Sequence, residues 1–336
     1  MTQKGGGKML KILMKKIPLV TIAAIIAGLL LSPGDSQAAA TDWPSRAVEV
    51  IVPYRAGGDT DFYARTYTKY LNKELAASMI VINIPGADGV VGCQQAASSR
   101  PDGYRVLFMN AGAMFTNKLA DISEIDHNAY DVAAIGILDN TNVLVANKQA
   151  GFTDAKDFLE KVKAAPGKYG VAATMPGFSY FTVCKLQSVG NFTLNAVDYG
   201  GSSAIVAAIV GNQVPLAVGN YGLFKQYIEK GDIIPLMAAS ENHNPNFPDV
   251  PTVGDIGLPG AEVERTYFFG FPKGTDPLII KKLSDAVGAI QKSPEFAAEI
   301  KAAYSVEPFY RDFATAKQYL DNTWNDMTKY KNLMKK

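Results

Sequence analysis

The sequence predicts an α/β fold arranged in two lobes. Short runs rich in valine and isoleucine alternate with helical patterns, and this alternation is typical of parallel β-α-β units. The chain has 336 residues and is 48% hydrophobic, which is enough for two ordinary cores. The predicted strands cover Val48–Val52, Ile80–Asn83, Arg105–Phe108, Tyr169–Ala173, Ala196–Tyr199, Val214–Val218 and Ile233–Ala239.

The first forty residues have the pattern of a secretory signal peptide. Five lysines precede an uncharged run from Ile17 to Leu31, and the small residues of Ser36–Ala40 follow it. We therefore expect a signal peptide over residues 1–40, cut near residues 38–40, and a periplasmic location. An uncleaved membrane anchor is the alternative, although the apolar run is short for a bilayer span. No cysteine stands near the cut, so we expect no lipid anchor.

The charge of the chain bears on its partners, and its cysteine content bears on disulfide bonding. Without the five lysines and Asp35 of residues 1–40, the chain keeps 28 basic and 31 acidic side chains. A net charge of about −3 argues against nucleic acid as a partner. Cys93 and Cys184 are the only cysteines, and they fall in different predicted lobes, so a disulfide stays open but is not expected.

The segments between the predicted strands carry helical spacing. Thr153 is the expected N-cap of a helix that ends at Pro166-Gly167, and Ser202 and Gly211 bracket another. The tail from Pro277 predicts three helices, broken near residues 293–294 and 307–308, which return to the first lobe across a hinge. One helical face carries side chains that we expect in the core rather than at a ligand site: Tyr63, Tyr67, Tyr70 and Leu71.

The loop after the first predicted strand has the features of an anion site. Gly57-Gly58 follow the strand and precede a helix, so backbone N–H groups can approach a ligand closely at a helix start of partial positive charge. Ligands of open α/β sheets bind at this carboxyl end of the strands. The alternative is a tight connection that needs glycine for its own geometry. Asp59 or Asp61 is expected to be an N-cap rather than a metal ligand.

An ordered series of short motifs spans the predicted mature chain. The motifs are Trp43-Pro44, Pro53-Tyr54 with Gly57-Gly58 and Asp61, Asn83 before Pro85-Gly86-Ala87, Pro101-Asp102-Gly103-Tyr104, Tyr199-Gly200-Gly201, Gly211-Asn212-Gln213-Val214, Pro248-Asp249-Val250-Pro251-Thr252 with Gly257, and Pro272-Lys273-Gly274-Thr275. Through these motifs, together with the signal peptide, the sequence resembles the tripartite tricarboxylate transporter receptor family, also called the Bug family.

The resemblance implies a type II-like two-lobe periplasmic-binding-protein fold with a ligand in the cleft. Each lobe would be a mostly parallel sheet flanked by helices, with lobe 1 formed by 41–141 plus 266–336 and lobe 2 by 142–265. The protein would capture a small carboxylate by lobe closure and deliver it to a membrane permease, as a monomer, without cofactor or metal. The implied ligand-binding residues are Tyr54, Arg55, Ala56, Gly57, Gly58, Thr60, Asp61, Asn110, Ala111, Gly112, Ala113, Thr174, Met175, Gly177, Phe178, Ser179, Tyr180, Tyr199, Gly200, Asn220 and Tyr221.

Several positions depart from the family pattern. Arg55 stands where the family usually has a small residue, and it either clamps a ligand carboxylate or forms a surface salt bridge. Asp88 replaces a usual glycine and Asp198 a usual proline; both are expected to be structural or to face solvent. The loop Met175–Phe181 is bulky and aromatic, which argues against a citrate-like ligand. Phe178, Tyr180 and Phe268 either stack on an apolar ligand body or belong to the core.

Catalysis and signalling are the competing functions. The chain has two histidines, His127 and His243, and neither lies in a catalytic motif. Gly177 and Ser179 match a hydrolase elbow only in part, because its second glycine is missing. The spacing of Gly86, Gly89 and Gly92 is not that of a dinucleotide-binding turn. We therefore expect no enzyme; an exported α/β hydrolase or a ligand-sensing receptor that signals to a partner remains the alternative.

Overall fold

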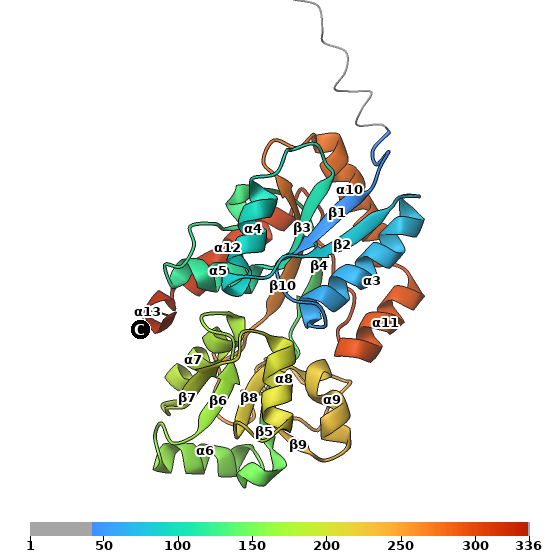
Figure 1. Ribbon diagram of the computed structural model, residues 1–336. Coiled ribbons are helices and arrows are strands. Elements are labelled where there is room, and N and C mark those ends of the chain that lie inside the picture. Colours follow the sequence, from blue (N-terminus) through green and yellow to red (C-terminus); the bar gives the residue numbers. More distant parts are fainter. Residues whose placement is uncertain (1–41, 335–336) are drawn as a thin grey trace, which may run out of the picture. The chain divides into compact units, whose positions relative to one another are not determined.

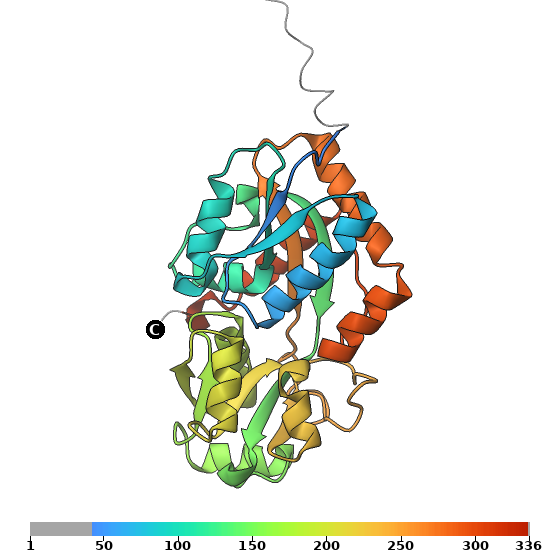
Figure 2. The ribbon, with the colours of Figure 1, turned by 45° about the vertical axis from the view of Figure 1, so that its right-hand side comes forward.

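The computed structural model describes residues 42–334. The predicted signal peptide and its cleavage point therefore lie outside the described residues. From Trp43 onward the chain forms one compact unit. Within it, helices flank two five-stranded sheets, each the centre of one lobe (Figures 1 and 2).

The first sheet combines strands from both ends of this unit. Its strand order is β2-β1-β3-β10-β4. Two helices, α3 (Asp59–Glu74) and α10 (Pro277–Ile290), pack together on one side of the sheet, and α11 (Pro294–Tyr304) packs on α3. Three more helices contact strands of this sheet: α4 (Val90–Ala97), α5 (Ala111–Leu119) and α12 (Ala316–Thr328). The short helix α13 (Lys331–Met334) follows α12 near the C-terminus (Figure 1). The strands are β1 (Val48–Val52), β2 (Met79–Asn83), β3 (Arg105–Asn110), β4 (Tyr130–Asp139) and β10 (Arg265–Pro272).

The second sheet comes from one continuous part of the chain. Its strand order is β7-β6-β8-β5-β9. Helices α8 (Ser202–Val210) and α9 (Tyr221–Glu229) pack together on this sheet, and α6 (Ala155–Ala164) and α7 (Phe178–Gly190) also contact it. The strands are β5 (Asn142–Asn147), β6 (Gly170–Ala173), β7 (Asn195–Asp198), β8 (Leu216–Asn220) and β9 (Ile233–Ala238), and the short 3-10 turns of the two lobes are η1 (Ala87–Gly89), η2 (His127–Ala129) and η3 (Lys148–Ala150).

The two α/β lobes confirm the predicted fold class, but each sheet is mixed rather than mostly parallel. In the first sheet, β1 pairs in parallel with β2 and β3, whereas β10 is antiparallel to β3 and β4. In the second, β6 is parallel to β7 and β8, whereas β5 is antiparallel to β8 and β9. The physical reason is that β4, β5 and β10 carry the chain between the lobes, and a strand that leaves or enters a lobe runs against its neighbours.

The aromatic face of α3 belongs to the core, as predicted. Tyr63, Tyr67 and Leu71 are fully buried, and Tyr70 is half-buried. The Tyr67 hydroxyl donates a hydrogen bond of 2.6 Å to the carbonyl of Gly136 in β4. This bond satisfies a buried hydroxyl and ties α3 to the far strand of the sheet.

Several helix ends differ from the predicted ones. Asp154, not Thr153, is the N-cap of α6, and its carboxylate accepts a hydrogen bond from the Asp157 N–H group at 2.9 Å. The tail contains α10, α11 and α12 as predicted, and a fourth short helix, α13, follows them. Cys93 in α4 and Cys184 in α7 are both buried, and no disulfide joins them.

Two chain crossings and the C-terminal helix connect the lobes, which also touch where α9 meets α11 and where α5 meets α7. Strand β4 passes through Asn140-Thr141 directly into β5, and the returning chain begins β10 at Arg265, the register partner of Asp139. The third connection is the C-terminal α13, which packs on α5 of the first lobe and α7 of the second. There the ring of Tyr330 meets Phe181 edge-on, with centroids 5.8 Å apart.

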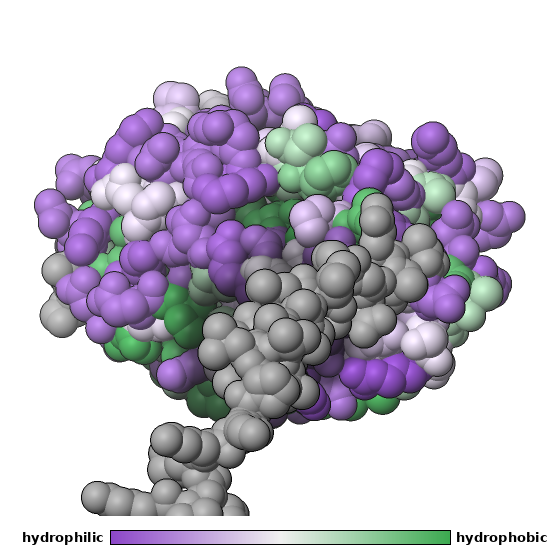
Figure 3. All heavy atoms as spheres, turned by 90° about the horizontal axis from the view of Figure 1, so that it is seen from above, coloured by the Kyte–Doolittle hydropathy of each residue, from purple (hydrophilic) through white to green (hydrophobic). Residues whose placement is uncertain are grey.

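Polar side chains dominate the surface seen in Figure 3. The hydrophobic side chains visible there form separate small groups rather than one continuous patch. Among residues 42–334, no helix has both the length and the apolar character needed to cross a membrane.

Gly222 lets the two lobes approach closely, and we expect its substitution by alanine to destabilise the protein. A Cβ atom there would lie 2.6 Å from Tyr304 Cα and would also collide with the Ala303 carbonyl, both in the backbone of α11. Overpacking of this kind costs about 1–3 kcal/mol. Urea denaturation should show that loss for Gly222→Ala but not for Gly254→Ala, because a Cβ on Gly254 meets only Thr252 Oγ1, at 3.6 Å. Equal midpoints for the two variants would contradict the expectation.

Candidate ligand-binding site

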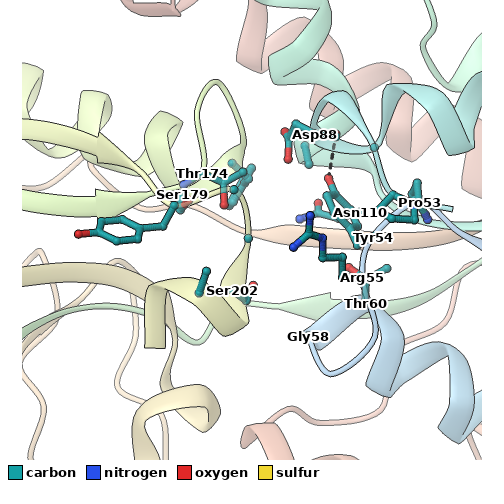
Figure 4. A pocket seen from close by; sticks show the side chains of 18 of the residues that line it. Pro53, Tyr54, Arg55, Gly58, Thr60, Asp88, Asn110, Thr174, Ser179 and Ser202 are labelled. Atoms are coloured by element: carbon teal, nitrogen blue, oxygen red, sulfur yellow. Dashed lines mark hydrogen bonds between the residues drawn. The ribbon is translucent and has the colours of Figure 1, made fainter. Parts of the chain in front are cut away.

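A cavity of about 590 Å³ is lined by residues of both lobes. It lies at the carboxyl ends of β1 and β3 in the first lobe and of β6 and β7 in the second. Figure 4 shows Arg55, Thr60 and Asn110 from the first lobe facing Thr174, Ser179 and Ser202 from the second. This is the position at which open α/β sheets bind ligands.

Four helices that begin at this cavity have glycine at the N-cap and therefore no side-chain cap. Helices α3, α4, α7 and α8 follow the N-cap residues Gly58, Gly89, Gly177 and Gly201, and none of these helix starts has a side-chain cap. A fifth helix, α5, also begins at the cavity but is capped by Asn110, whose side chain accepts from the Gly112 N–H group at 2.9 Å. The first N–H groups of a helix have no intrahelical acceptor, so the uncapped starts offer donors to a bound anion.

Most of the predicted binding residues come together at this cavity. The first-lobe and second-lobe loops meet there although they are more than sixty positions apart in the sequence. The residues that were predicted and that line the cavity are Tyr54, Arg55, Gly58, Thr60, Asp61, Asn110, Ala113, Thr174, Met175, Phe178, Ser179, Tyr199 and Gly200.

The other predicted positions lie outside the lining. Asn220 is fully buried between the lobes, where its amide contacts Arg265 and Asp139. The ring of Tyr221 stacks on Phe247 with centroids 4.2 Å apart. Gly112 lies under the ring of Phe178, which leaves no room for a Cβ atom there. The full set outside the lining is Ala56, Gly57, Ala111, Gly112, Gly177, Tyr180, Asn220 and Tyr221.

Asp61 fixes the glycine loop rather than capping the helix. Its carboxylate accepts from the N–H group of Gly57 at 3.0 Å and from Asn83 Nδ2 at 2.9 Å, and it pairs with Arg65 at 2.9 Å. Burial acts to raise the pKa of Asp61, but these hydrogen bonds and the charge of Arg65 outweigh it and lower the pKa. The carboxylate is therefore ionised and fully engaged, which holds the turn after β1 in place.

Asp59 also differs from its expected role as an N-cap, because it belongs to a buried charge network at the hinge. Its Oδ2 accepts from Arg265 at 3.1 Å and from the Tyr267 hydroxyl at 3.0 Å. Arg265, only 4% exposed, also contacts Asn220, which in turn contacts Asp139. Burial raises the pKa of Asp139, and the guanidinium of Arg265 opposes this rise. The network joins α3, β4, β8 and β10 where the chain passes between lobes.

Arg55 projects into the cavity from the exposed loop after β1 (Figure 4). No carboxylate of residues 42–334 forms an ion pair with it. The two interpretations from sequence were a ligand clamp and a surface salt bridge. The geometry favours the first, because an unpaired guanidinium beside uncapped helix starts adds to their attraction for an anion.

Sequence reasoning missed part of the cavity wall. Asp88 and Asp198, expected to be structural or to face solvent, both line the cavity, and so does the buried Arg265. Of the three aromatic residues considered for stacking, Phe178 lines it, whereas Tyr180 and Phe268 do not. The turns Pro85-Gly86 and Gly200-Gly201 are sequence signals that could have found part of the missed lining. The other lining residues that were not predicted are Pro53, Asp59, Pro85, Gly86, Ala87, Gly89, Ile122, Pro176, Gly201, Ser202, Ser203 and Ala204.

Two α/β lobes around one polar cavity define the class of two-lobe periplasmic binding proteins. The chain belongs to the tripartite tricarboxylate transporter receptor family, whose model, described as "Tripartite tricarboxylate transporter family receptor", matches residues 63–336. The family resemblance seen in the sequence motifs is thus confirmed.

Individual relatives cover nearly the whole chain. Protein BugT of Bordetella pertussis is 27% identical over 296 residues, which are 86% of this chain and 90% of the relative. A solved structure described as a periplasmic transporter is 27% identical, with a TM-score of 0.79, and the match covers 87% of this chain and 99% of that one. An R. palustris protein solved with adipate is 23% identical, with a TM-score of 0.81 and coverage of 87% and 98%, and shares the fold.

Proposed function

We propose that this receptor captures a small carboxylate between its lobes and hands it to a membrane permease without chemical change. The observation that carries the proposal is the convergence of four uncapped, glycine-led helix starts on one cavity. Membership of a transporter receptor family supports the role in uptake. The pattern of residues 1–40 supports export to the periplasm.

The cavity offers a carboxylate several kinds of donor. Backbone N–H groups at the helix starts carry partial positive charge. The hydroxyl of Thr60 from the first lobe and those of Ser179 and Ser202 from the second line the same cavity. Ordered water between these groups and the ligand would be almost as favourable as direct bonds. A ligand that contacts both lobes stabilises the closed form, so binding shifts the population from open to closed.

The positions of the histidines support binding rather than catalysis. His127 Nε2 lies 2.7 Å from Asp321 and is buried, and His243 Nε2 lies 3.0 Å from Asp255 on the surface. Neither histidine lines the cavity. Within the described part of the chain, no group of three or more histidine, cysteine or acidic side chains is arranged to hold a metal ion.

A thermal-shift screen followed by titration calorimetry tests the proposal. The purified receptor should be screened against mono-, di- and tricarboxylates, aromatic acids and amino acids. An acid at a hundred times its Kd should stabilise the folded state by about 2.7 kcal/mol. The receptor should return the acid unaltered after incubation. Stabilisation by none of the acids, or chemical conversion of one, would contradict the proposal.

Arg55→Ala should lower the affinity for the best carboxylate of that screen by more than tenfold. The reason is the loss of a charge-assisted contact worth about 1.4 kcal/mol or more. Calorimetry of wild type and variant measures the change. Arg100→Ala is the matched control, because Arg100 is exposed and outside the cavity lining. A loss of less than tenfold, or an equal loss in both variants, would remove the clamp role.

A further inference from the structure

Asp88 is held at the cavity by its backbone. It lies in η1, directly after the Pro85-Gly86 turn, with a left-handed conformation of φ 48°. Its carbonyl accepts hydrogen bonds from the Tyr54 hydroxyl at 3.3 Å and from Asn117 Nδ2 at 2.9 Å. Two neighbouring segments therefore fix this residue, and Figure 4 shows its carboxylate directed toward the second-lobe residues Thr174 and Ser179.

The Asp88 carboxylate lacks a countercharge. No basic side chain of residues 42–334 forms an ion pair with it, and Oδ2 is buried without a hydrogen-bond partner among the described residues. The second lobe approaches this oxygen through Gly177, where a Cβ atom would lie only 2.9 Å from Oδ2. A buried, unsatisfied carboxylate is costly, and such groups call for a partner that the chain itself does not provide.

Asp198 adds a second negative charge from the other lobe. It lines the same cavity, and its Oδ1 accepts from the N–H groups of Met175 at 3.0 Å and Gly200 at 2.9 Å. Burial raises the pKa of Asp88 to about 7, and repulsion by Asp198 contributes to the rise, while the Tyr54 hydroxyl opposes it. The Cys93 thiol also lies within electrostatic range of Asp88, and burial raises the pKa of this thiol.

The remaining charges of the cavity are already paired. Asp59 is neutralised by Arg265 and Asp61 by Arg65. Of the charged side chains that line the cavity, Arg55, Asp88 and Asp198 have no ionic partner among the described residues. The cavity is therefore bipolar: a guanidinium and helix starts attract an anion, and two carboxylates from opposite lobes attract a cation.

We propose, building on the carboxylate-binding function above, that the natural ligand is an amino-substituted organic acid whose ammonium group pairs with Asp88. Asp198 adds to the attraction across the cleft. The ammonium supplies the countercharge that the chain lacks, and it draws the two lobes together because its partners lie on both. Acids without an amine leave two carboxylates facing the cavity and gain only the anion contacts.

Titration calorimetry with matched acids tests this inference. The pairs are succinate and L-aspartate, glutarate and L-glutamate, and butyrate and 4-aminobutyrate, whose members differ only by an amine. In at least one pair the wild type should bind the amine-bearing member at least tenfold more tightly. Asp88→Asn should weaken that binding by tenfold or more and tighten binding of the amine-free member. Asp285→Asn, an exposed change on α10, should alter neither affinity.

Proton exchange gives an independent measurement. An ammonium favours the ionised carboxylate, so binding of the amine-bearing acid near pH 7 should release a proton from Asp88 to the buffer. The affinity should rise about tenfold from pH 6 to pH 8, as the ionised fraction of a group with a pKa of about 7 increases. Asp88→Asn should remove both effects.

Three results would overturn the inference. They are equal affinities within every pair, retention of the amine preference in Asp88→Asn, and proton uptake on binding, since uptake would mean that a neutral Asp88 donates to a ligand carboxylate. In these cases amine-free acids still bind and the carboxylate function stands. If no acid of either kind binds, the proposed function fails and this inference fails with it.

Discussion

Arg265→Met is expected to lower the free energy of unfolding by about 3–5 kcal/mol at pH 7, because it leaves buried carboxylates without their cation. Arg265 neutralises Asp59 and reaches Asp139 through Asn220, so its removal would leave two acids facing each other between the lobes. Removal of one partner from a buried ion pair costs far more than removal of an exposed pair. Urea denaturation followed by circular dichroism measures the loss.

Two further variants make this result specific. Arg46→Met removes an exposed arginine that pairs with Asp102 at 3.2 Å, and it should cost at most about 1 kcal/mol. The double variant Arg265→Met with Asp59→Asn should recover part of the stability, because one of the unpaired charges is then absent. If Arg265→Met is no more costly than Arg46→Met, the buried network is not a stabilising feature of the hinge.

Ser202→Asp should lower the affinity for any carboxylate ligand by at least a hundredfold. Ser202 is the first residue of α8, at a helix start that has no side-chain cap and lines the cavity. An aspartate there would occupy the N–H donors itself and repel the ligand. A hundredfold loss corresponds to about 2.7 kcal/mol, less than the repulsion of two charges 4 Å apart near a protein surface. Titration calorimetry with the best acid measures it.

Ser293→Asp is the matched control for this prediction. Ser293 caps α11 by accepting from the Phe296 N–H group at 3.2 Å, and it lies outside the cavity lining. Aspartate is an equally good N-cap and the position lies outside the cavity, so the affinity should be retained. A Ser202→Asp variant that still binds with wild-type affinity would show that α8 does not contact the ligand.

The strands that could be predicted from sequence are those with turns close to both ends. The strand from Val48 to Val52 was predicted at its observed bounds. In contrast, β4, β5 and β10 were missed. Every residue of β5 and β10 is buried, so neither strand shows the alternation that marks a half-exposed strand. Both faces of these strands are covered because the strands run between the lobes. The neighbouring sequence does not indicate this burial, since it depends on segments far away in the chain.

Some residues of the candidate site could likewise be predicted from the sequence, and others could not. The loop around Gly57-Gly58 was recognisable because a glycine pair after a strand and before a helix has few structural uses. Asn220 ends β8 directly before a helix, yet it contacts Asp139 and Arg265 at the hinge, and these partners are distant in sequence. The importance of Asp88 depends on the absence of a countercharge nearby, which one sequence cannot reveal.

The register pairing of Asp139 with Arg265 has a consequence for the architecture of the gene product. The polypeptide departs for the second sheet and comes back at directly opposed positions of two antiparallel strands. Everything between them is thus topologically an insertion at the tip of a β-hairpin, and a short reverse turn would suffice to reconnect the host strands. A shortened polypeptide without the inserted second lobe would show whether the first lobe folds by itself.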